Sequence, residues 1–368
     1  MKNILALTLF FLTTSFAFSL PRYATEIGAN CSLCHTNPTG GGIRNNYGTT
    51  VFSKEDLALK SVQEYLETDF DGEVNDFIFV GADLGTTWKQ NNKSEFQDGF
   101  GSVKANLYVT AKPNRILNFY SKIDLSGENS HEVFGLLEAE NSGVGVFIKI
   151  GKFAPDFGLK VSNQTYYTRN GENGKGLDFD SKKIDTGIQF GISPFESVQL
   201  LYAFSDGNSR IGNNLLQKGS SKDKAHTIRA EFTKTIRAVN FSFGGTYRQH
   251  GYNKAANLFG TFGFWRLVWN GDLTFIESEN AFRGLEIASL NEVFFKIKQG
   301  LYLSSSYELY DPNHEVKNDK NGAKRFGFGL DFYPFIFTKI TAKFRHEKPF
   351  DSEQKKTNSL LLGFNFWF

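Results

Sequence analysis

The sequence predicts an all-β protein, an antiparallel β-barrel of about sixteen strands that follows a small N-terminal module. Three observations predict this class. The chain has 39 Phe and 14 Tyr among its 368 residues, yet its mean hydropathy is negative. No apolar run reaches the length of a transmembrane helix, and apolar and polar side chains alternate along most of the chain. A membrane-spanning barrel explains this mixture, because lipid-facing and lumen-facing side chains alternate along its strands.

Residues 1–19 have the parts of a secretory signal peptide. Lys2 supplies the positive charge, and the apolar run 4–12 is shorter than the about 20 residues of a spanning helix. Ala17 and Ser19 are small residues at the positions that a signal peptidase reads. We therefore expect an exported protein whose mature chain starts near residue 20.

Both cysteines of the chain lie in one motif, Cys31-Ser-Leu-Cys34-His35. In an exported protein this spacing indicates one covalent haem c: the two thiols form thioethers, and His35 is the proximal iron ligand. A thioredoxin-type motif would need a βαβ context, and a structural zinc site would need four ligands. A disulfide between Cys31 and Cys34 would leave His35 without a role.

We expect residues 20–75 to form the haem module. The glycines at 40–42 predict a turn where the chain passes close to a flat macrocycle. Ser53 and Asp56 resemble a capping box and predict a helix that continues to about Glu67. A segment this short with few apolar residues would be only marginally stable by itself. We therefore expect it to pack against the barrel wall or to plug the lumen.

Residues 76–368 carry the strand pattern of the barrel. In the clearest case Val239, Phe241 and Phe243 alternate with Asn240 and Ser242. One face meets lipid and the other faces the lumen. Sixteen segments show this pattern: 76–88, 101–111, 115–125, 132–140, 144–152, 183–193, 198–205, 227–235, 238–249, 255–264, 267–277, 286–297, 301–310, 324–333, 337–346 and 357–368.

The connections between these segments alternate in length. Tight turns are predicted at 112–114, 141–143, 194–196, 236–237, 265–266, 298–300 and 334–335. Longer polar loops are predicted at 89–100, 126–131, 153–182, 206–226, 250–254, 278–285, 311–323 and 347–356. Outer-membrane barrels have short periplasmic turns and long outer loops, whereas a β-sandwich would not alternate in this way. An even number of strands then places both termini on the periplasmic side.

The last segment supports a bacterial outer-membrane location. Leu360, Leu362, Phe364, Phe366 and Phe368 alternate, which resembles the final-strand signal of the barrel-assembly machinery. Outer-membrane lipid is then a partner of the barrel. The charge is nearly balanced, with 41 Lys and Arg against 39 Asp and Glu and no basic tract, so we expect no nucleic-acid partner.

In layout the chain resembles the fused monohaem cytochrome–porins, a group that includes outer-membrane iron oxidases. The matching part is Pro21 to Gly28, the motif at 31–35, Pro38 and Tyr47-Gly48, and residues 151–159 resemble a porin segment where strand five enters a long loop. The iron-oxidase pattern continues with a Pro, a Leu-Thr and a Phe-Gly-Arg, where this chain has Thr-Gly-Gly-Gly-Ile-Arg at 39–44. The resemblance implies a haem-carrying barrel, with Fe(II) as one candidate substrate.

The second axial ligand of the haem iron is not a methionine, because the only one, Met1, lies in the predicted signal peptide. His250 follows the lumen-facing positions Thr246 and Arg248 and is our candidate distal ligand. The alternatives are a solvated His250 with a five-coordinate iron, or ligation by Lys, Tyr, the N-terminal amine or a small exogenous ligand.

Two classes of function follow. In the first, the protein transfers electrons across the outer membrane between an extracellular donor or acceptor and a periplasmic redox carrier, with metal oxidation such as that of Fe(II) as its enzymatic form. In the second, it is a diffusion porin with a periplasmic haem appendage for electron shuttling or sensing. Occupancy of the lumen separates them, because a plug predicts low ion conductance and an appendage predicts an open pore.

Overall fold

The structure is a computed structural model of the chain. It describes residues 21–28, 30–63, 71–92, 99–101, 103–127, 130–141, 143–161, 165–169, 171–172, 175–177, 184–207, 223–277, 285–316 and 320–368. The predicted signal peptide, residues 1–19, lies outside this part of the chain.

The N-terminal segment, residues 21–63, consists of short helices and turns. Its helices are α2 (Pro21–Ile27), α3 (Cys31–Cys34), the π-helix η1 (Tyr47–Leu57) and α4 (Lys60–Gln63). The helix that we predicted from Ser53 begins earlier, and the predicted capping box is wrong. Ser53 lies inside η1 and its hydroxyl donates to the Gly48 carbonyl at 2.7 Å, so it caps no helix start. None of the described helices is long and apolar enough to cross a bilayer.

All sixteen predicted strands are present. In the described part of the chain, eighteen strands form one antiparallel sheet, and β1 and β3 are short additions of three and two residues. The bounds are β1 (Glu73–Asn75), β2 (Ile78–Asn91), β3 (Gly99–Phe100), β4 (Lys104–Ala111), β5 (Leu117–Asp124), β6 (Glu132–Asn141), β7 (Val144–Phe153), β8 (Asp185–Phe195), β9 (Val198–Ser205), β10 (Ala225–Ile236), β11 (Val239–His250), β12 (Asn253–Phe264), β13 (Leu267–Glu277), β14 (Leu285–Lys298), β15 (Leu301–Asp311), β16 (Ala323–Phe332), β17 (Thr338–Pro349) and β18 (Thr357–Trp367).

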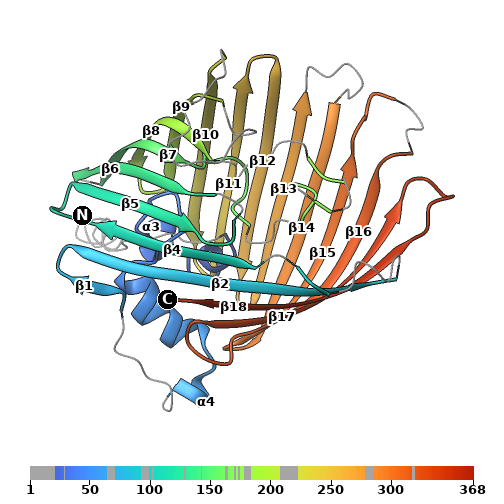
Figure 1. The fold of residues 1–368 in the computed structure, drawn as a ribbon, viewed down its shortest axis with the longest axis horizontal. Coiled ribbons are helices and arrows are strands. Elements are labelled where there is room, and N and C mark those ends of the chain that lie inside the picture. Colours follow the sequence, from blue (N-terminus) through green and yellow to red (C-terminus); the bar gives the residue numbers. More distant parts are fainter. Residues whose placement is uncertain are drawn as a thin grey trace, which may run out of the picture.

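The sheet closes into a barrel of sixteen strands (Figure 1). Each strand from β4 to β18 pairs with the next one, and β18 and β4 both pair with β2. The tight turns lie at one end of the barrel, where β2 begins and β18 ends. At the other end the connections are longer, with one exception: the loop predicted at 250–254 is a two-residue turn, 251–252. The strands β11 and β12 pair in register up to His250 and Asn253, which leaves no residues for a longer loop.

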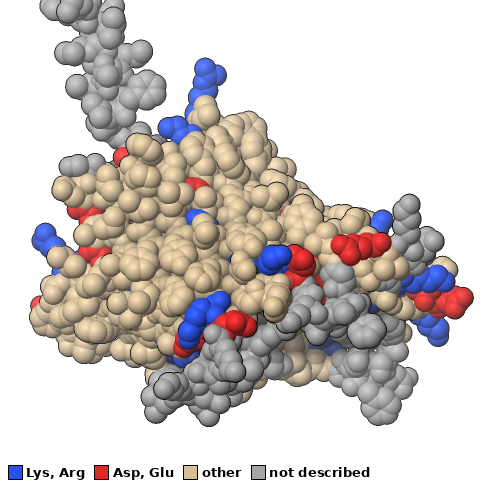
Figure 2. Space-filling view, turned by 90° about the horizontal axis from the view of Figure 1, so that it is seen from above, with Lys and Arg blue, Asp and Glu red and all other residues tan. Residues whose placement is uncertain are grey.

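The barrel is apolar on its outer wall and polar inside. On β12, Leu258 and Phe262 are 61% and 41% exposed, whereas Asn257 and Thr261, in the opposite phase of the strand, are 2% and 3% exposed. The outer wall therefore fits the hydrocarbon region of a bilayer. Figure 2 shows a broad uncharged area on the outside, with most of the charged side chains toward its edges. Because the inward polar residues are also buried, material fills the lumen.

The N-terminal segment is part of that material. Figure 1 shows α3 enclosed by the strands, with α4 beyond the tight-turn end. Arg22 forms an ion pair with Asp331 of β16 at 2.6 Å, and Arg22 and Asp331 are 7% and 6% exposed. The Thr25 hydroxyl donates to Thr261 of β12 at 2.7 Å. Cys34 packs in a buried cluster that includes Trp367 of β18. The module thus plugs the lumen, one of the two placements expected from its sequence.

Candidate functional site

The Cys-x-x-Cys-His motif forms one short helical turn. α3 begins at Cys31 because Asn30 caps it, and the Asn30 side-chain oxygen accepts a hydrogen bond from the Ser32 N–H at 3.3 Å. The His35 N–H donates to the Cys31 carbonyl at 3.0 Å. The turn places Cys31 and Cys34 three residues apart on neighbouring positions of one helix face, and no disulfide joins them.

His35 is buried next to this turn, at 6% exposure. Its backbone pairs with Arg44 in a short β-bridge. Burial, and then the Arg44 guanidinium, lower the pKa of His35 to about 3. The imidazole is therefore neutral, which is the form that binds a metal. Its Nδ1 has no hydrogen-bond partner among the described residues, so this side chain retains a nitrogen that a ligand can satisfy.

Glycines bring the chain close to both cysteines. The predicted turn at 40–42 is present, and Gly40 has a φ of 82°. A Cβ at Gly40 would lie 2.8 Å from Cys31 Sγ, closer than side chains pack. A Cβ at Gly48 would collide with the Cys34 carbonyl. Only glycine fits at these two positions without displacing the cysteine turn.

Cys31 faces a small cavity between the N-terminal segment and the barrel wall. The cavity has a volume of about 60 Å³. Burial raises the pKa of the Cys31 thiol to about 12, so the thiol keeps its proton. Residues that line the cavity include Cys31, Thr39, Lys160, Arg229, Glu231 and Asn240.

The described residues 154–161, 165–169, 171–172 and 175–177, between β7 and β8, fold back into the lumen, and we call them the inward loop. Its Lys160 forms an ion pair with the buried Asp156, and the Lys160 ammonium donates to the Thr39 carbonyl. Lys149 of β7 donates to the Thr39 hydroxyl at 3.3 Å. Burial alone would raise the pKa of Asp156. The charges of Lys160 and Lys149 have the larger, opposite effect and lower this pKa to about 2. Because Thr39 precedes Gly40, the inward loop supports one side of the cysteine turn.

The inward loop continues across the lumen to the opposite wall. Arg169 forms a buried ion pair with Asp272 of β13 at 3.2 Å. The Tyr166 hydroxyl donates to Glu292 of β14 at 2.5 Å. The Tyr167 hydroxyl donates to Glu347 of β17 at 2.7 Å. The lumen therefore contains two layers, the N-terminal segment toward the tight turns and the inward loop beyond it.

The donor set fits one haem c, but the space is small. Two thiols three residues apart and a neutral histidine next to the second thiol are the attachment groups of this cofactor. The cavity beside Cys31 has room for only a few water molecules. A macrocycle at this place therefore requires the chain around Thr39 and the Lys160 side chain to move away from the cysteine turn.

The structure does not bring His250 to this site. His250 ends β11 at the far end of the barrel, where its ring lies against Gly207. Asn240, near the start of β11, contacts the N-terminal segment through the Thr25 carbonyl at 2.8 Å. Ten residues of strand separate His250 from Asn240, or about 33 Å along the strand.

Sequence reasoning missed two residues of the site, Arg22 and Lys160. Arg22 lies in the stretch that carries the family resemblance, and Lys160 directly follows the porin-like stretch 151–159. Their positions beside recognisable segments were the available signal. Their partners, Asp331 and Thr39, are 309 and 121 residues away along the chain, and no local pattern marks such pairs.

Comparisons with known proteins place the barrel among porin folds. The chain matches no protein-family model and no curated protein. It is similar in structure to OprB of Pseudomonas putida, with a TM-score of 0.63 and 10% identity over 79% of this chain and 94% of that one. It is also similar to an anion-selective porin from Comamonas acidovorans, with a TM-score of 0.55 and 13% identity over 79% and 99%. At such identities the similarity establishes a porin-like barrel fold.

Proposed function

We propose that this protein is a bacterial outer-membrane barrel that carries one covalent haem c in its lumen and transfers electrons across the membrane. The observation that carries the proposal is the position of the motif. Cys34 and His35 are 3% and 6% exposed inside the barrel, near the tight-turn end. In outer-membrane barrels this end faces the periplasm. Both termini are then periplasmic, and outer-membrane lipid surrounds the outer wall.

Three residues would hold the cofactor. Cys31 and Cys34 form the thioethers, and His35 supplies the proximal ligand. When bound, the haem exchanges single electrons with its partners. His35 is neutral, and Gly40 and Gly48 let the chain approach the cysteine turn closely, so the three attachment groups are held together. A periplasmic redox carrier would exchange electrons from below, and an extracellular donor or acceptor, with Fe(II) among the candidates, from the loop side.

The filled lumen supports electron transfer over solute diffusion. The N-terminal segment and the inward loop meet where Lys160 contacts Thr39, so the described residues form two successive barriers. An electron carrier needs no continuous water channel, whereas a diffusion porin does. The distal ligand stays open in this proposal, because His250 lies at the other end of β11.

A second candidate function is a diffusion porin whose haem module is a periplasmic appendage. The similarity of the barrel to known porins supports this function, since the similar structures include one described as an anion-selective porin. This function requires the N-terminal segment to leave the lumen. Its contacts, the Arg22–Asp331 ion pair among them, oppose that movement.

Three measurements on the purified full-length protein test these candidates. We expect covalent haem staining in the wild type and in Ser32→Ala, a change at the exposed residue between the cysteines, and none in Cys31→Ala/Cys34→Ala. We expect low conductance in planar bilayers. We also expect an impermeant oxidant or reductant such as Fe(II), added on the loop side of proteoliposomes, to change the haem redox state. Absence of haem stain in the wild type would refute the cofactor. Stained protein with a large conductance that responds only to periplasmic reagents would favour the second candidate.

A further inference from the structure

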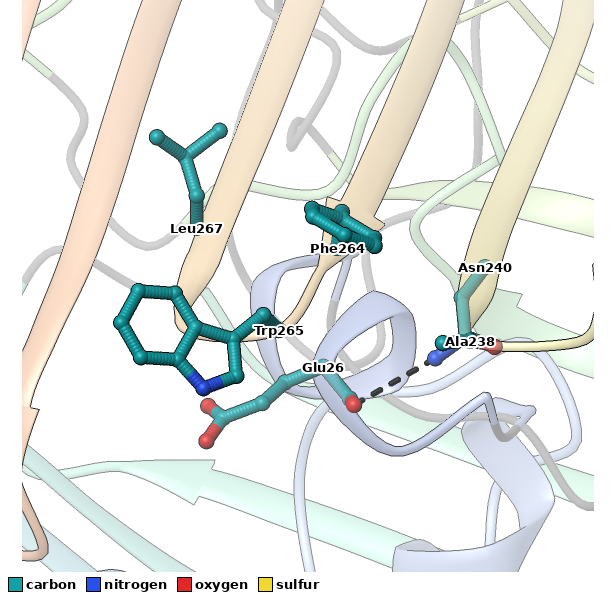
Figure 3. Close-up of a pocket in the computed structure, with 7 residues that line it drawn as sticks. Glu26, Ala238, Asn240, Phe264, Trp265 and Leu267 are labelled. Atoms are coloured by element: carbon teal, nitrogen blue, oxygen red, sulfur yellow. Dashed lines mark hydrogen bonds between the residues drawn. The ribbon is translucent and has the colours of Figure 1, made fainter.

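A groove opens at the tight-turn end of the barrel, between helix α2 and two turns (Figure 3). Its volume is about 470 Å³, within the range of pockets that hold a ligand or a side-chain anchor. We call it the rim groove. Residues that line it include Glu26, Ala238, Asn240, Phe264, Trp265 and Leu267.

Two turns beside the rim groove have residues that a hairpin does not favour. Trp265 has a φ of 54° in the β12–β13 turn, and Arg237 has a φ of 56° in the β10–β11 turn. Glycine, asparagine and aspartate adopt this left-handed backbone at lower free energy, by about 1 kcal/mol or more. Trp265 is also 72% exposed, and its ring meets that of Phe295 only edge-on, with 6.3 Å between the ring centres, so most of its surface is free. The side chains themselves, and not the turn geometry, account for these residues.

Exposed cations surround the rim groove, and the one acid that lines it, Glu26, is paired with Lys296. Arg237 and Arg266 are exposed on two successive tight turns, and Lys298 is exposed at the end of β14, where the next turn begins. The Arg266 guanidinium lies 5.1 Å from the centre of the Trp265 ring and donates to a backbone carbonyl at 3.0 Å, so its position is fixed. Tryptophan and arginine are the residues that most often dominate protein–protein binding energies. An exposed Trp with one fixed arginine and two further exposed cations near it fits a partner that presents an apolar side chain surrounded by carboxylates.

The rim groove is next to the haem-attachment segment. Asn240 lines both the rim groove and the cavity beside Cys31, so these two spaces lie on either side of one residue. Its amide donates to the carbonyl groups of Thr25 and Glu26, at 2.8 and 3.3 Å. Cys31 follows Glu26 by only five residues in the chain. A molecule seated in the rim groove would therefore be close to the cysteine turn.

We propose that the rim groove docks an acidic periplasmic electron-carrier protein, which inserts an apolar side chain beside Trp265 and places carboxylates on Arg237 and Arg266. This inference rests on the proposed function, whose periplasmic partner it locates. A lipid headgroup is the other occupant that an exposed Trp suggests. The groove lies at the edge between the barrel mouth and the outer wall. Asn240 and the Gly263 position face Thr25 of the N-terminal segment, whereas Phe264 and Leu267 are exposed on the outward side.

The test measures binding to the full-length protein in phosphatidylcholine nanodiscs. The probe is plastocyanin, a small acidic copper protein, and the basic mitochondrial cytochrome c is the opposite-charge control. At low ionic strength we expect Arg237→Glu/Arg266→Glu to weaken plastocyanin binding about tenfold. The matched control is Arg115→Glu, at an exposed arginine on the β4–β5 turn of the same rim, which should change the affinity less than about twofold.

A second variant separates docking from folding. Trp265→Asn suits the left-handed backbone, so we expect thermal stability to be unchanged or higher while plastocyanin binding weakens about fivefold or more. The Cys31→Ala/Cys34→Ala variant should bind plastocyanin like the wild type. Binding without haem would support the docking surface even if the proposed cofactor is wrong. Equal affinity for both probes, or unchanged plastocyanin binding in both rim variants, would overturn the docking surface. Unchanged binding with lower stability of Trp265→Asn in the bilayer would assign the tryptophan to lipid.

Discussion

Asp331→Asn should release the plug. The Asp331 carboxylate accepts a hydrogen bond from Arg22 of the N-terminal segment at 2.6 Å and pairs with Lys339 at 3.0 Å. The amide keeps the shape of the side chain but removes its charge. Arg22, which is 7% exposed, then keeps a buried positive charge without its carboxylate partner. The substitution leaves the export segment unchanged, which a change at Arg22 itself would not guarantee.

The expected magnitude follows from the burial of this pair. Removing one partner of a buried ion pair destabilises by about 3–5 kcal/mol. We take the lower end, about 3 kcal/mol, because an amide oxygen still accepts one hydrogen bond and because Arg22 also lies 4.3 Å from the ring centres of Phe294 and Tyr302. That free energy corresponds to an increase of about 150-fold in the population with the plug unseated.

Single-channel recording and limited trypsinolysis measure this population. The fraction of time in open-channel events should rise in Asp331→Asn. Cleavage after Arg44, whose guanidinium lies over the Trp367 ring inside the barrel, should become faster. Glu277→Gln is the matched control, because Glu277 pairs with Lys254 where both are largely exposed, and it should change neither readout appreciably. Wild-type recordings and cleavage rates from a folded Asp331→Asn barrel would refute the reasoning.

Three further predictions concern the cysteine turn and its support. Lys160→Met should lower the stability of the folded protein by about 2–3 kcal/mol, seen as a lower midpoint of thermal unfolding, because it leaves the buried Asp156 without its nearest cation. Gly40→Ala should reduce the haem stain, because the added Cβ meets Cys31 Sγ, whereas Gly41→Ala, with a similar φ and nothing within 4 Å, should not; equal staining would contradict this account. Asp156 has its pKa lowered from 3.8 to about 2, so its stabilising effect of about 2 kcal/mol is complete above pH 4 and is lost as pH falls toward about 2. Unfolding midpoints measured against pH should show this loss in the wild type and not in Asp156→Asn.

The strands were predictable because the side-chain period of two is a local property. The alternation at Val239, Phe241 and Phe243 reports directly which face meets lipid. The alternating connection lengths then fixed the order of strands and the end at which β2 begins. The single wrong loop, at 250–254, contains polar residues that occur equally in a tight turn. Gly251, with a φ of 58°, supplies the left-handed residue that such a turn needs.

The interior of the lumen was less predictable, because its contacts join distant parts of the chain. The motif Cys31-Cys34-His35 is contiguous, so its local geometry followed from spacing. Whether the module enters the lumen depends on pairs such as Arg22 with Asp331, and neither residue carries a local signal for the other. His250 was chosen by strand phase alone. The alternation of side chains shows which face of a strand a residue lies on, but not how far along the barrel axis it lies. His250 and the cysteine turn lie at different positions along that axis.

The depth of the cysteine turn has a consequence for biogenesis. Cys34 and His35 are enclosed once β18 has paired with β2, because Trp367 and Tyr333 pack over Cys34. An enzyme that attaches haem to both thiols cannot reach them through a wall of hydrogen-bonded strands. On the proposed function, the cofactor must therefore be attached in the periplasm while the chain is still open. Haem would then have to be attached before the barrel closes, and barrels that close without it would stay without it.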